Sequence, residues 1–274
     1  MALPMSISTD SSSSSLPYNP KNIVINLADL SSLLVPFGHD GLINDINIFR
    51  KAFVHRSYCT RKNENFITGN VKCPDGCVPL QEESQERLEF LGDAVVGIII
   101  GHYLFERFPD ENEGFLTKMR TKLVNGLMLA HLGELLDLGR YVIISKQIED
   151  NEGRQSKRIL EDCFEAFVGA MFRDNGSNLD KVTIWLIGLI EQNLDFSDLI
   201  VTNTNHKDTM LKHYQHSFGY VPKFYEMGTE VCKNTRGKIY IICAKDNKDQ
   251  VLGKGKGPTK KAAENDCSKN IMNL

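Results

Sequence analysis

One long segment, Glu83 to Arg107, determines much of what the front of this chain can become. Apolar residues recur on nearly every side of its middle, which predicts a central, buried helix rather than a surface helix. Phe108-Pro109-Asp110 predicts the end of that helix. The apolar positions that carry this prediction are Leu88, Leu91, Val95, Val96, Ile98 and Ile99.

Helical periodicity extends from about residue 23 to residue 200. It predicts further helices near 43–55, 113–124, 126–138, 155–173 and 178–193. No strand-like alternation interrupts it, so residues 23–200 are expected to form an all-α domain. A polar stretch with several Gly and Pro between Tyr58 and Glu83 predicts a long loop, and loops of that length tend to be functional or mobile.

The two ends of the chain have different patterns. Residues 1–22 are rich in Ser, Pro and Asn, which predicts a disordered tail. Residues 201–205 form a short polar linker. From 206 to 274 the pattern predicts a helix after Lys207, short strands at Phe224, 238–244 and 250–253, and a closing helix from Pro258. The expected order α-β-β-β-α is that of a small α+β domain.

Charge is divided between these two regions. The whole chain carries a net −3, but residues 206–274 hold 13 Lys+Arg and 7 Asp+Glu, a net of +6. The remainder, 32 less 13 basic and 35 less 7 acidic residues, has a net of −9. An acidic front and a basic tail predict different electrostatic roles.

Cysteine content and hydropathy bear on the compartment. The seven cysteines, an odd number, favour a reducing compartment such as cytoplasm or nucleus. No uninterrupted apolar run approaches the roughly 18 residues of a membrane span, and no secretory or mitochondrial leader is expected.

Two acidic pairs lie in apolar helical segments. Glu89 and Asp93 are four residues apart, and Asp162 and Glu165 three apart, so each pair shares a helix face. If the two helices pack together, four carboxylates meet, and clustered oxygen ligands suit Mg²⁺, which could activate water for phosphodiester hydrolysis. The alternative is that the acids form surface salt bridges with neighbours such as Arg158.

The basic tail contains Gly253-Lys254-Gly255-Lys256-Gly257 just before the closing helix. Glycines before a helix N-terminus let backbone amides approach a phosphate. Lys260 and Lys261 in the first turn oppose the helix dipole, which is reasonable for phosphate binding. A solvated basic helix end is the alternative.

The run Glu86-Arg87-Leu88-Glu89-Phe90-Leu91-Gly92-Asp93-Ala94 resembles the motif of the ribonuclease III family nearly residue for residue. Segments 52–58, 112–120 and 162–165 resemble other family motifs, in the family's order. The resemblance implies a multidomain chain whose nuclease domain is a double-strand-specific endoribonuclease. Its implied metal ligands are Glu89, Asp93, Asp162 and Glu165, of which Asp93 and Glu165 are the principal catalytic residues.

The same resemblance implies Mg²⁺ as cofactor, with Mn²⁺ as a substitute, and products with 5′-phosphates, 3′-hydroxyls and short 3′ overhangs. Glu86 and Glu113 match accessory acids of the family. A homodimer is implied, with Phe90 as the aromatic that contacts the partner. The long loop 59–82 departs from the compact bacterial pattern.

The segment 206–274 resembles a double-stranded-RNA-binding domain. The resemblance assigns RNA contacts to the first helix, to a strand turn and to the last helix. These residues are Lys207, Thr209, Lys212, Asn234, Arg236, Lys260 and Lys261. His213 and Glu264 depart from the family pattern, which implies modest affinity.

Cys73 and Cys77, together with Cys59 and His55, could suggest a zinc site. His55 belongs to the helical segment that resembles the ribonuclease III family, so no fourth ligand is well placed and a zinc site is not favoured. A non-catalytic protein that sequesters duplex RNA is the rival function, but it would not need all four carboxylates. A length-measuring dicing enzyme would need modules that these residues leave no room for. The sequence does not identify the RNA substrate, and the Ser-rich tail and long loop are compatible with a eukaryotic or viral source.

Overall fold

The computed structural model describes residues 17–60, 73–201, 206–231 and 238–272. It divides into two compact units, 1–199 and 200–274, each of which is described by itself. The first unit is helical. Its helices are α1 (Leu27–Leu34), α2 (Ile46–Ala52), α3 (Glu86–Arg107), α4 (Glu113–Leu123), α5 (Gly126–Leu135), α6 (Lys146–Asp150), α7 (Lys157–Asp174), α8 (Asp180–Asn193) and α9 (Phe196–Val201).

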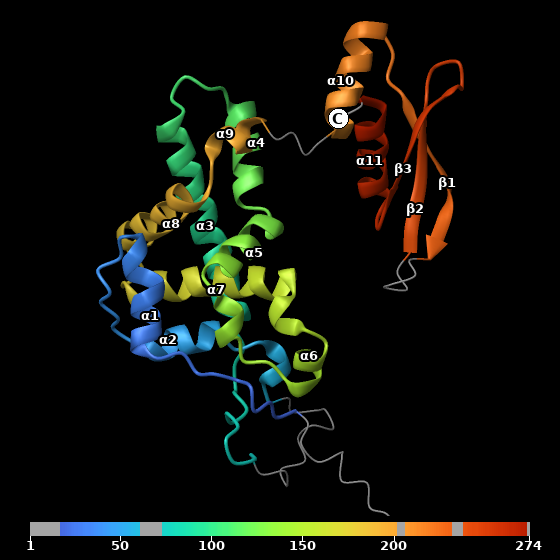
Figure 1. Ribbon diagram of the computed structural model, residues 1–274. Coiled ribbons are helices and arrows are strands. Elements are labelled where there is room, and N and C mark those ends of the chain that lie inside the picture. The colour runs from blue at the N-terminus through green and yellow to red at the C-terminus, as the bar shows by residue number, and fades with distance from the viewer. Residues whose placement is uncertain (1–16, 61–72, 202–205, 232–237, 273–274) are drawn as a thin grey trace, which may run out of the picture. The chain divides into compact units, whose positions relative to one another are not determined.

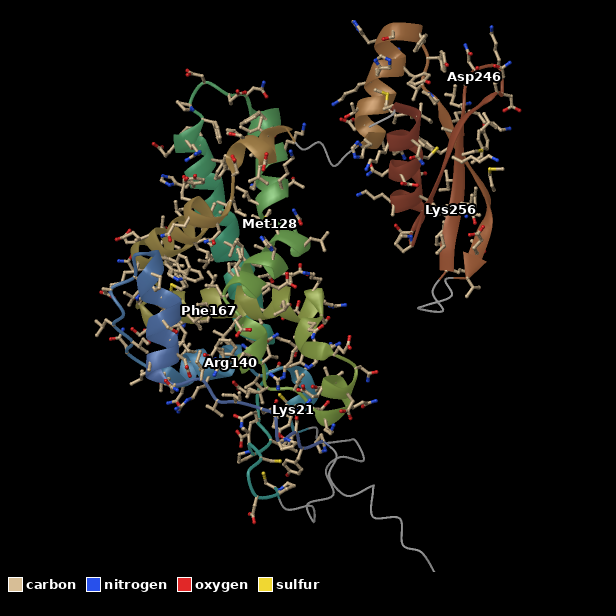
Figure 2. The ribbon with its side chains drawn as sticks, in the orientation of Figure 1. Lys21, Met128, Arg140, Phe167, Asp246 and Lys256 are labelled. Atoms are coloured by element: carbon tan, nitrogen blue, oxygen red, sulfur yellow. The ribbon has the colours of Figure 1, made fainter. Side chains whose placement is uncertain are left out.

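The core of the helical unit is built around α7, which runs across α3 and also packs on α2 and α5 (Figure 1). Phe167, labelled in Figure 2, is fully buried and its ring contacts those of Phe49, Phe53 and Trp185. The indole Nε1 of Trp185 donates to the Leu33 carbonyl at 2.9 Å, so the one polar atom of the ring is satisfied. The helical prediction for this region is confirmed.

The central helix α3 reaches solvent along one side, contrary to the prediction of an all-round buried helix. Phe90, Ile98 and Phe105 are 81%, 56% and 65% exposed, while Val96 and Ile100 on the other side are buried. By length and hydropathy, α3 is the one helix in the described part of the chain that would pass for a membrane span, with a mean hydropathy of 1.6. Core helices of soluble proteins pass the same test, so this is weak evidence for a membrane.

Polar side chains begin several helices in the way the sequence favours. Asn112 and Asn125 cap α4 and α5 by accepting from Phe115 and Met128 backbone amides. Ser145 does the same for α6, a five-residue helix that hydrophobic periodicity did not reveal because it is too short for one. These caps fix where α4 and α5 enter the unit beside the α3–α7 pair.

Residues 17–22 were assigned to a disordered tail, and this part of the assignment is wrong. The Asn19 side chain is fully buried and its amide donates to the Ile144 carbonyl and to Glu149 Oε2. Asn22 donates to the Ile144 carbonyl at 3.0 Å and accepts from the Ile144 amide at 3.1 Å. Arg154 also donates to Asn22 Oδ1, so this segment is pinned by side-chain hydrogen bonds that leave no local sequence pattern. Residues 1–16 lie outside the described part.

The second unit has α10 (His206–Phe218), β1 (Lys223–Val231), β2 (Lys238–Lys245), β3 (Val251–Gly257) and α11 (Lys260–Met272). The strands form one antiparallel sheet in the order β1-β2-β3, and α11 packs on it (Figure 1). The predicted order α-β-β-β-α is confirmed within the described residues. All three strands are longer than expected, and β1 contains a bulge between Glu226 and Gly228.

Gly255 and Gly257 were expected to lie between the last strand and the closing helix, where their amides could approach a phosphate; they belong to β3, together with Gly253. A Cβ on Gly255 would lie 2.0 Å from the Cys267 amide nitrogen, and one on Gly257 would lie 2.6 Å from the Ala263 amide nitrogen. Side chains would therefore push α11 off the sheet. The alternation of glycine with lysine is a strand pattern, with the glycines facing α11 and Lys254 and Lys256 on the other face.

The described end of the long loop is tied to the helical unit. Thr60 donates its amide to the Gln81 carbonyl at 2.8 Å, and Tyr58 donates its hydroxyl to the Val78 carbonyl at 2.7 Å. Cys73 and Cys77 pack near Tyr58, and both are free thiols. In the described residues no group of three His, Cys, Asp or Glu side chains is placed to hold a metal ion.

Candidate active site

Two facing glycines set the closest approach of α3 and α7. A Cβ on Gly92 would lie 1.8 Å from the Glu165 carbonyl oxygen, and a Cβ on Gly169 would lie 2.2 Å from the Leu88 carbonyl oxygen. The backbones of the two helices therefore touch at this crossing, where any other residue would force them apart. Asp93 follows Gly92 directly, and Glu165 lies one turn before Gly169, so the crossing brings both predicted acidic pairs together.

The four predicted carboxylates interact electrostatically at this crossing. Burial first, and then the negative charges of Asp93 and three other acids, raise the pKa of Glu165 to about 8. Burial, and then the charge of Asp162, raise the pKa of Glu89 to about 7. Glu89, Asp162 and Glu165 are half-buried, whereas Asp93 is exposed. Acids on two separate helices thus raise one another's pKa values. The alternative of simple surface salt bridges does not account for this.

Two arginines lie beside this acidic group. The pKa of Asp162 is raised by burial, while the charges of Arg158 and Arg56 act in the opposite direction. Glu89, Asp162 and both arginines line a cavity of about 150 Å³ together with Glu86. The cavity therefore carries acids on its α3 and α7 walls and cations at its side.

A fifth carboxylate, Glu161, belongs to this region and was missed from the sequence. Its pKa is raised by burial, then by the charge of Asp162, and further by that of Asp93. Its two carboxylate oxygens lie 2.3 and 2.4 Å from where a Cβ of Gly126 would stand, at the start of α5. The available signal was its spacing of four residues from Glu165, which places both on one helix face.

The accessory acids occupy two different places. Glu86 accepts from the Ser84 hydroxyl at 2.7 Å and lies 3.7 Å from Arg56, on the wall of the acidic cavity. Glu113 is not brought to that cavity. It accepts from the Thr117 hydroxyl at 2.8 Å and lines a separate hollow of about 420 Å³ that also contains Phe105.

The predicted dimer contact, Phe90, extends from α3 next to a third hollow of about 770 Å³. This hollow is also lined by Lys51, Arg87 and Arg173. The Phe90 ring is 81% exposed although α3 is the central helix of the unit.

The acidic cluster fits a hard divalent cation by the chemistry of its donors. All of its members offer carboxylate oxygens, the ligands that Mg²⁺ prefers. Burial first, and then the charges of neighbouring acids, raise the pKa values of Glu89 and Glu165, so a bound cation would favour their ionised forms. As the side chains stand, no three acids among the described residues are already gathered into a ligating group.

The expected RNA-binding residues divide into three sets. Lys207, Thr209 and Lys212 lie on α10, and Lys260 and Lys261 begin α11. Lys261 is exposed, while Lys207 and Lys260 form ion pairs with Glu264 and Glu226. Asn234 and Arg236 lie outside the described residues.

Comparison with known proteins matches residues 45–185 to the family model described as Ribonuclease-III-like. A probable ribonuclease 3 of Acanthamoeba polyphaga mimivirus is 34% identical over 259 residues, which is 93% of this chain and 46% of that protein. This chain therefore spans about half the length of the mimivirus relative. Ribonuclease 3 of a Nitratiruptor species is 30% identical over 230 residues, 84% of this chain and 90% of that protein.

Among solved structures, the nuclease domain of ribonuclease III from Campylobacter jejuni covers 62% of this chain and 99% of its own length. Its sequence identity is 31% and its TM-score 0.49. The description of that structure refers to structural flexibility in a region involved in dimer formation of the Campylobacter domain.

Proposed function

Because this chain belongs to the ribonuclease III family, and is an endoribonuclease of that type, we propose that it hydrolyses double-stranded RNA at the α3–α7 crossing. One observation carries the proposal. Glu89 and Asp93 on α3 and Asp162 and Glu165 on α7 act on one another electrostatically, across two glycines that keep the helices in backbone contact.

Mg²⁺ is the proposed cofactor, with Mn²⁺ as a substitute, and Glu89, Asp93, Asp162 and Glu165 are the residues that would hold it. When bound, a divalent cation of this kind supplies an activated water for attack on phosphorus and stabilises the leaving oxygen. The donor set, oxygen only and negatively charged, supports this choice.

The protein's own residues have distinct tasks in this proposal. Glu165, with a pKa of about 8, holds a proton at neutral pH until a cation favours its ionised form. Asp93 is exposed and so faces the approaching substrate. Arg56 lies beside Glu86, and Arg56 and Arg158 act on the Asp162 carboxylate; both cations border the acidic cavity and offset repulsion between the acids and a phosphate.

We further propose that two copies associate through the exposed side of α3. Phe90, Ile98 and Phe105 lie on that side, and removing large apolar side chains from water favours association. Each subunit would then cut one strand, leaving 5′-phosphates, 3′-hydroxyls and short 3′ overhangs.

The second unit is proposed to be a double-stranded-RNA-binding domain. Its α-β-β-β-α order and its excess of Lys and Arg support this role. Domains of that kind recognise the shape of an A-form helix and its 2′-hydroxyls rather than a sequence. Lys207, Thr209 and Lys212 on α10, and Lys260 and Lys261 on α11, are the proposed contacts, together with Asn234 and Arg236.

Cleavage of a long labelled RNA duplex tests the proposal, with wild type compared with Glu165→Gln in Mg²⁺. Wild type is expected to cut and to leave 5′-phosphates, while the variant binds the duplex without cutting it. Glu106→Gln, an exposed acid on α3 away from the cluster, is the matched control and should cut like wild type. A wild type that binds duplex RNA but cuts it with neither Mg²⁺ nor Mn²⁺ would favour a sequestering protein instead.

A further inference from the structure

Three of the lysines proposed to bind RNA have carboxylate neighbours. Three ion pairs occur in this unit at or beside α10 and α11, two between elements and one within α10. They are Lys207 with Glu264 at 2.6 Å, Lys260 with Glu226 at 2.7 Å, and Lys212 with Asp208 at 2.7 Å. Each of these lysines would have to exchange a carboxylate for a phosphate in order to bind RNA.

The Lys207–Glu264 pair is the most enclosed of the three. Its side chains are 34% and 23% exposed, against 77% and 51% for Lys212 and Asp208. The Lys207 ammonium also lies 4.8 Å from the centroid of the Phe224 ring. The Lys207 amide nitrogen donates to the side chain of Asn265 at 3.1 Å, which fixes the start of α10 against α11. Water and salt screen such a partly buried pair less than an open one.

We propose that Glu264 limits the affinity of this protein for duplex RNA by holding the Lys207 ammonium. This inference rests on the proposed RNA-binding function of the second unit. A lysine whose charge is already compensated by a carboxylate gains little from meeting a phosphate and displaces fewer counterions from the RNA.

An equivalent ion pair on the other face of the sheet provides a control. Lys256 and Glu230 are joined at 2.8 Å, with side chains 57% and 53% exposed. They are paired in register with Ile241 and Ile239, whereas Gly255, which faces α11, is paired with Ile242. Lys256, labelled on the sheet in Figure 2, therefore points away from α10 and α11. Glu230→Gln removes the same charge on the sheet face that points away from α10 and α11.

The test measures binding of the full chain to a duplex of roughly 20 base pairs, longer than the about 16 that one such domain spans, in EDTA so that no cleavage occurs. Glu264→Gln is expected to lower the Kd about five-fold at moderate salt. The slope of log K against log salt should steepen by about one, the value for one added phosphate contact. Glu230→Gln should change neither quantity.

A double-mutant cycle with Lys207→Met separates the action of Glu264 through Lys207 from simple repulsion. Lys207→Met is introduced both alone and together with Glu264→Gln, so that each Kd is compared with that of the parent chain carrying the same residue at position 264. In the Glu264→Gln background it should remove the gain. A Glu264→Gln variant that melts like wild type but binds no more tightly overturns the inference, and so does a gain that persists without Lys207. If wild type and Glu264→Gln both fail to bind any duplex, the RNA-binding function itself fails.

Discussion

Gly92 of α3 and Gly169 of α7 face each other at the point where the two helices are in backbone contact. A Cβ on the first would lie 1.8 Å from the Glu165 carbonyl oxygen, and one on the second 2.2 Å from that of Leu88. The separation of the two helices that carry the catalytic acids is therefore set by contact between their backbones rather than by packing of side chains.

Gly92→Ala should separate the helices and destabilise the helical unit by about 3 kcal/mol. Gly97→Ala is the matched control in the same helix, since a Cβ there has no atom within 4 Å. Because alanine favours helix over glycine, the control should stabilise the unit by up to about 1 kcal/mol. Urea denaturation followed by circular dichroism measures both. Equal effects of the two substitutions would contradict the close contact.

Glu165→Gln should stabilise the protein in chelator at pH 8. Burial and the neighbouring acids raise the folded-state pKa of Glu165 from 4.5 to about 8. A raised acid pKa means that the folded state is favoured at low pH, and that this advantage is lost as pH rises from about 4.5 towards 8. After a discount for relaxation of neighbouring groups and for water, Glu165→Gln should raise the free energy of unfolding at pH 8 by about 2 kcal/mol.

Thermal melts with and without Mg²⁺ measure this effect. Mg²⁺ should raise the Tm of wild type by compensating the acids, and should raise that of Glu165→Gln less. If Mg²⁺ raised both melting temperatures equally, Glu165 would not belong to the cation site.

Glu149 should contribute stability with the opposite pH dependence. Burial alone would raise the pKa of Glu149, but the Asn19 hydrogen bond at 2.9 Å and Arg154 at 2.7 Å outweigh it and lower the pKa. The contribution is therefore present above the unfolded value of about 4.5 and is lost as pH falls through the lowered folded pKa. Glu149→Gln should lower the free energy of unfolding by about 2 kcal/mol at pH 7.

Urea denaturation of this variant at several pH values is the measurement. The cost of Glu149→Gln should shrink below pH 4, whereas Glu152→Gln, at an exposed acid nearby, should have little effect at any pH. If the loss of stability caused by Glu149→Gln were the same at pH 7 and pH 3, the ionised form of Glu149 would not be the source of the stabilisation.

Phe90→Ser should weaken self-association without unfolding the subunit. The ring is 81% exposed, so its removal deprives the monomer of little buried area, while a dimer through α3 would lose an aromatic contact. Sedimentation velocity at micromolar concentration should show a shift from dimer to monomer. Ile184→Ser, at a 55% exposed apolar residue on α8, is the control and should sediment like wild type. A monomeric wild type would refute the proposed dimer directly.

The sequence predicted those parts of the fold that repeat along the chain. Helices α3 and α7 follow from apolar periodicity, and the acidic pairs follow from their spacing on those helices. It did not predict that Asn19 and Asn22 dock on Ile144, because those bonds join residues more than 120 positions apart. Such contacts depend on the completed fold rather than on a local pattern.

The candidate site was predicted in its members but not in its surroundings. The pairing of Glu89 with Asp162 across helices required only that α3 and α7 meet. Glu161 was not predicted, although its spacing of four residues from Glu165 places both acids on one face of α7. The position of Glu113 depends on where α4 begins, and the Asn112 cap fixes that start. Residue spacing does not predict in which direction the capped helix leaves the preceding loop, so the separation of Glu113 from the other acids was not predicted.

The two faces of strand β3 have different roles. Glycines 253, 255 and 257 admit α11, while Lys254 and Lys256 stand on the far side. The outer pair can therefore be exchanged for neutral or acidic residues to vary the charge of this unit stepwise, with the hydrophobic interior left as it is. With a series of such variants, the net charge of the whole C-terminal unit could be set through substitutions on one strand.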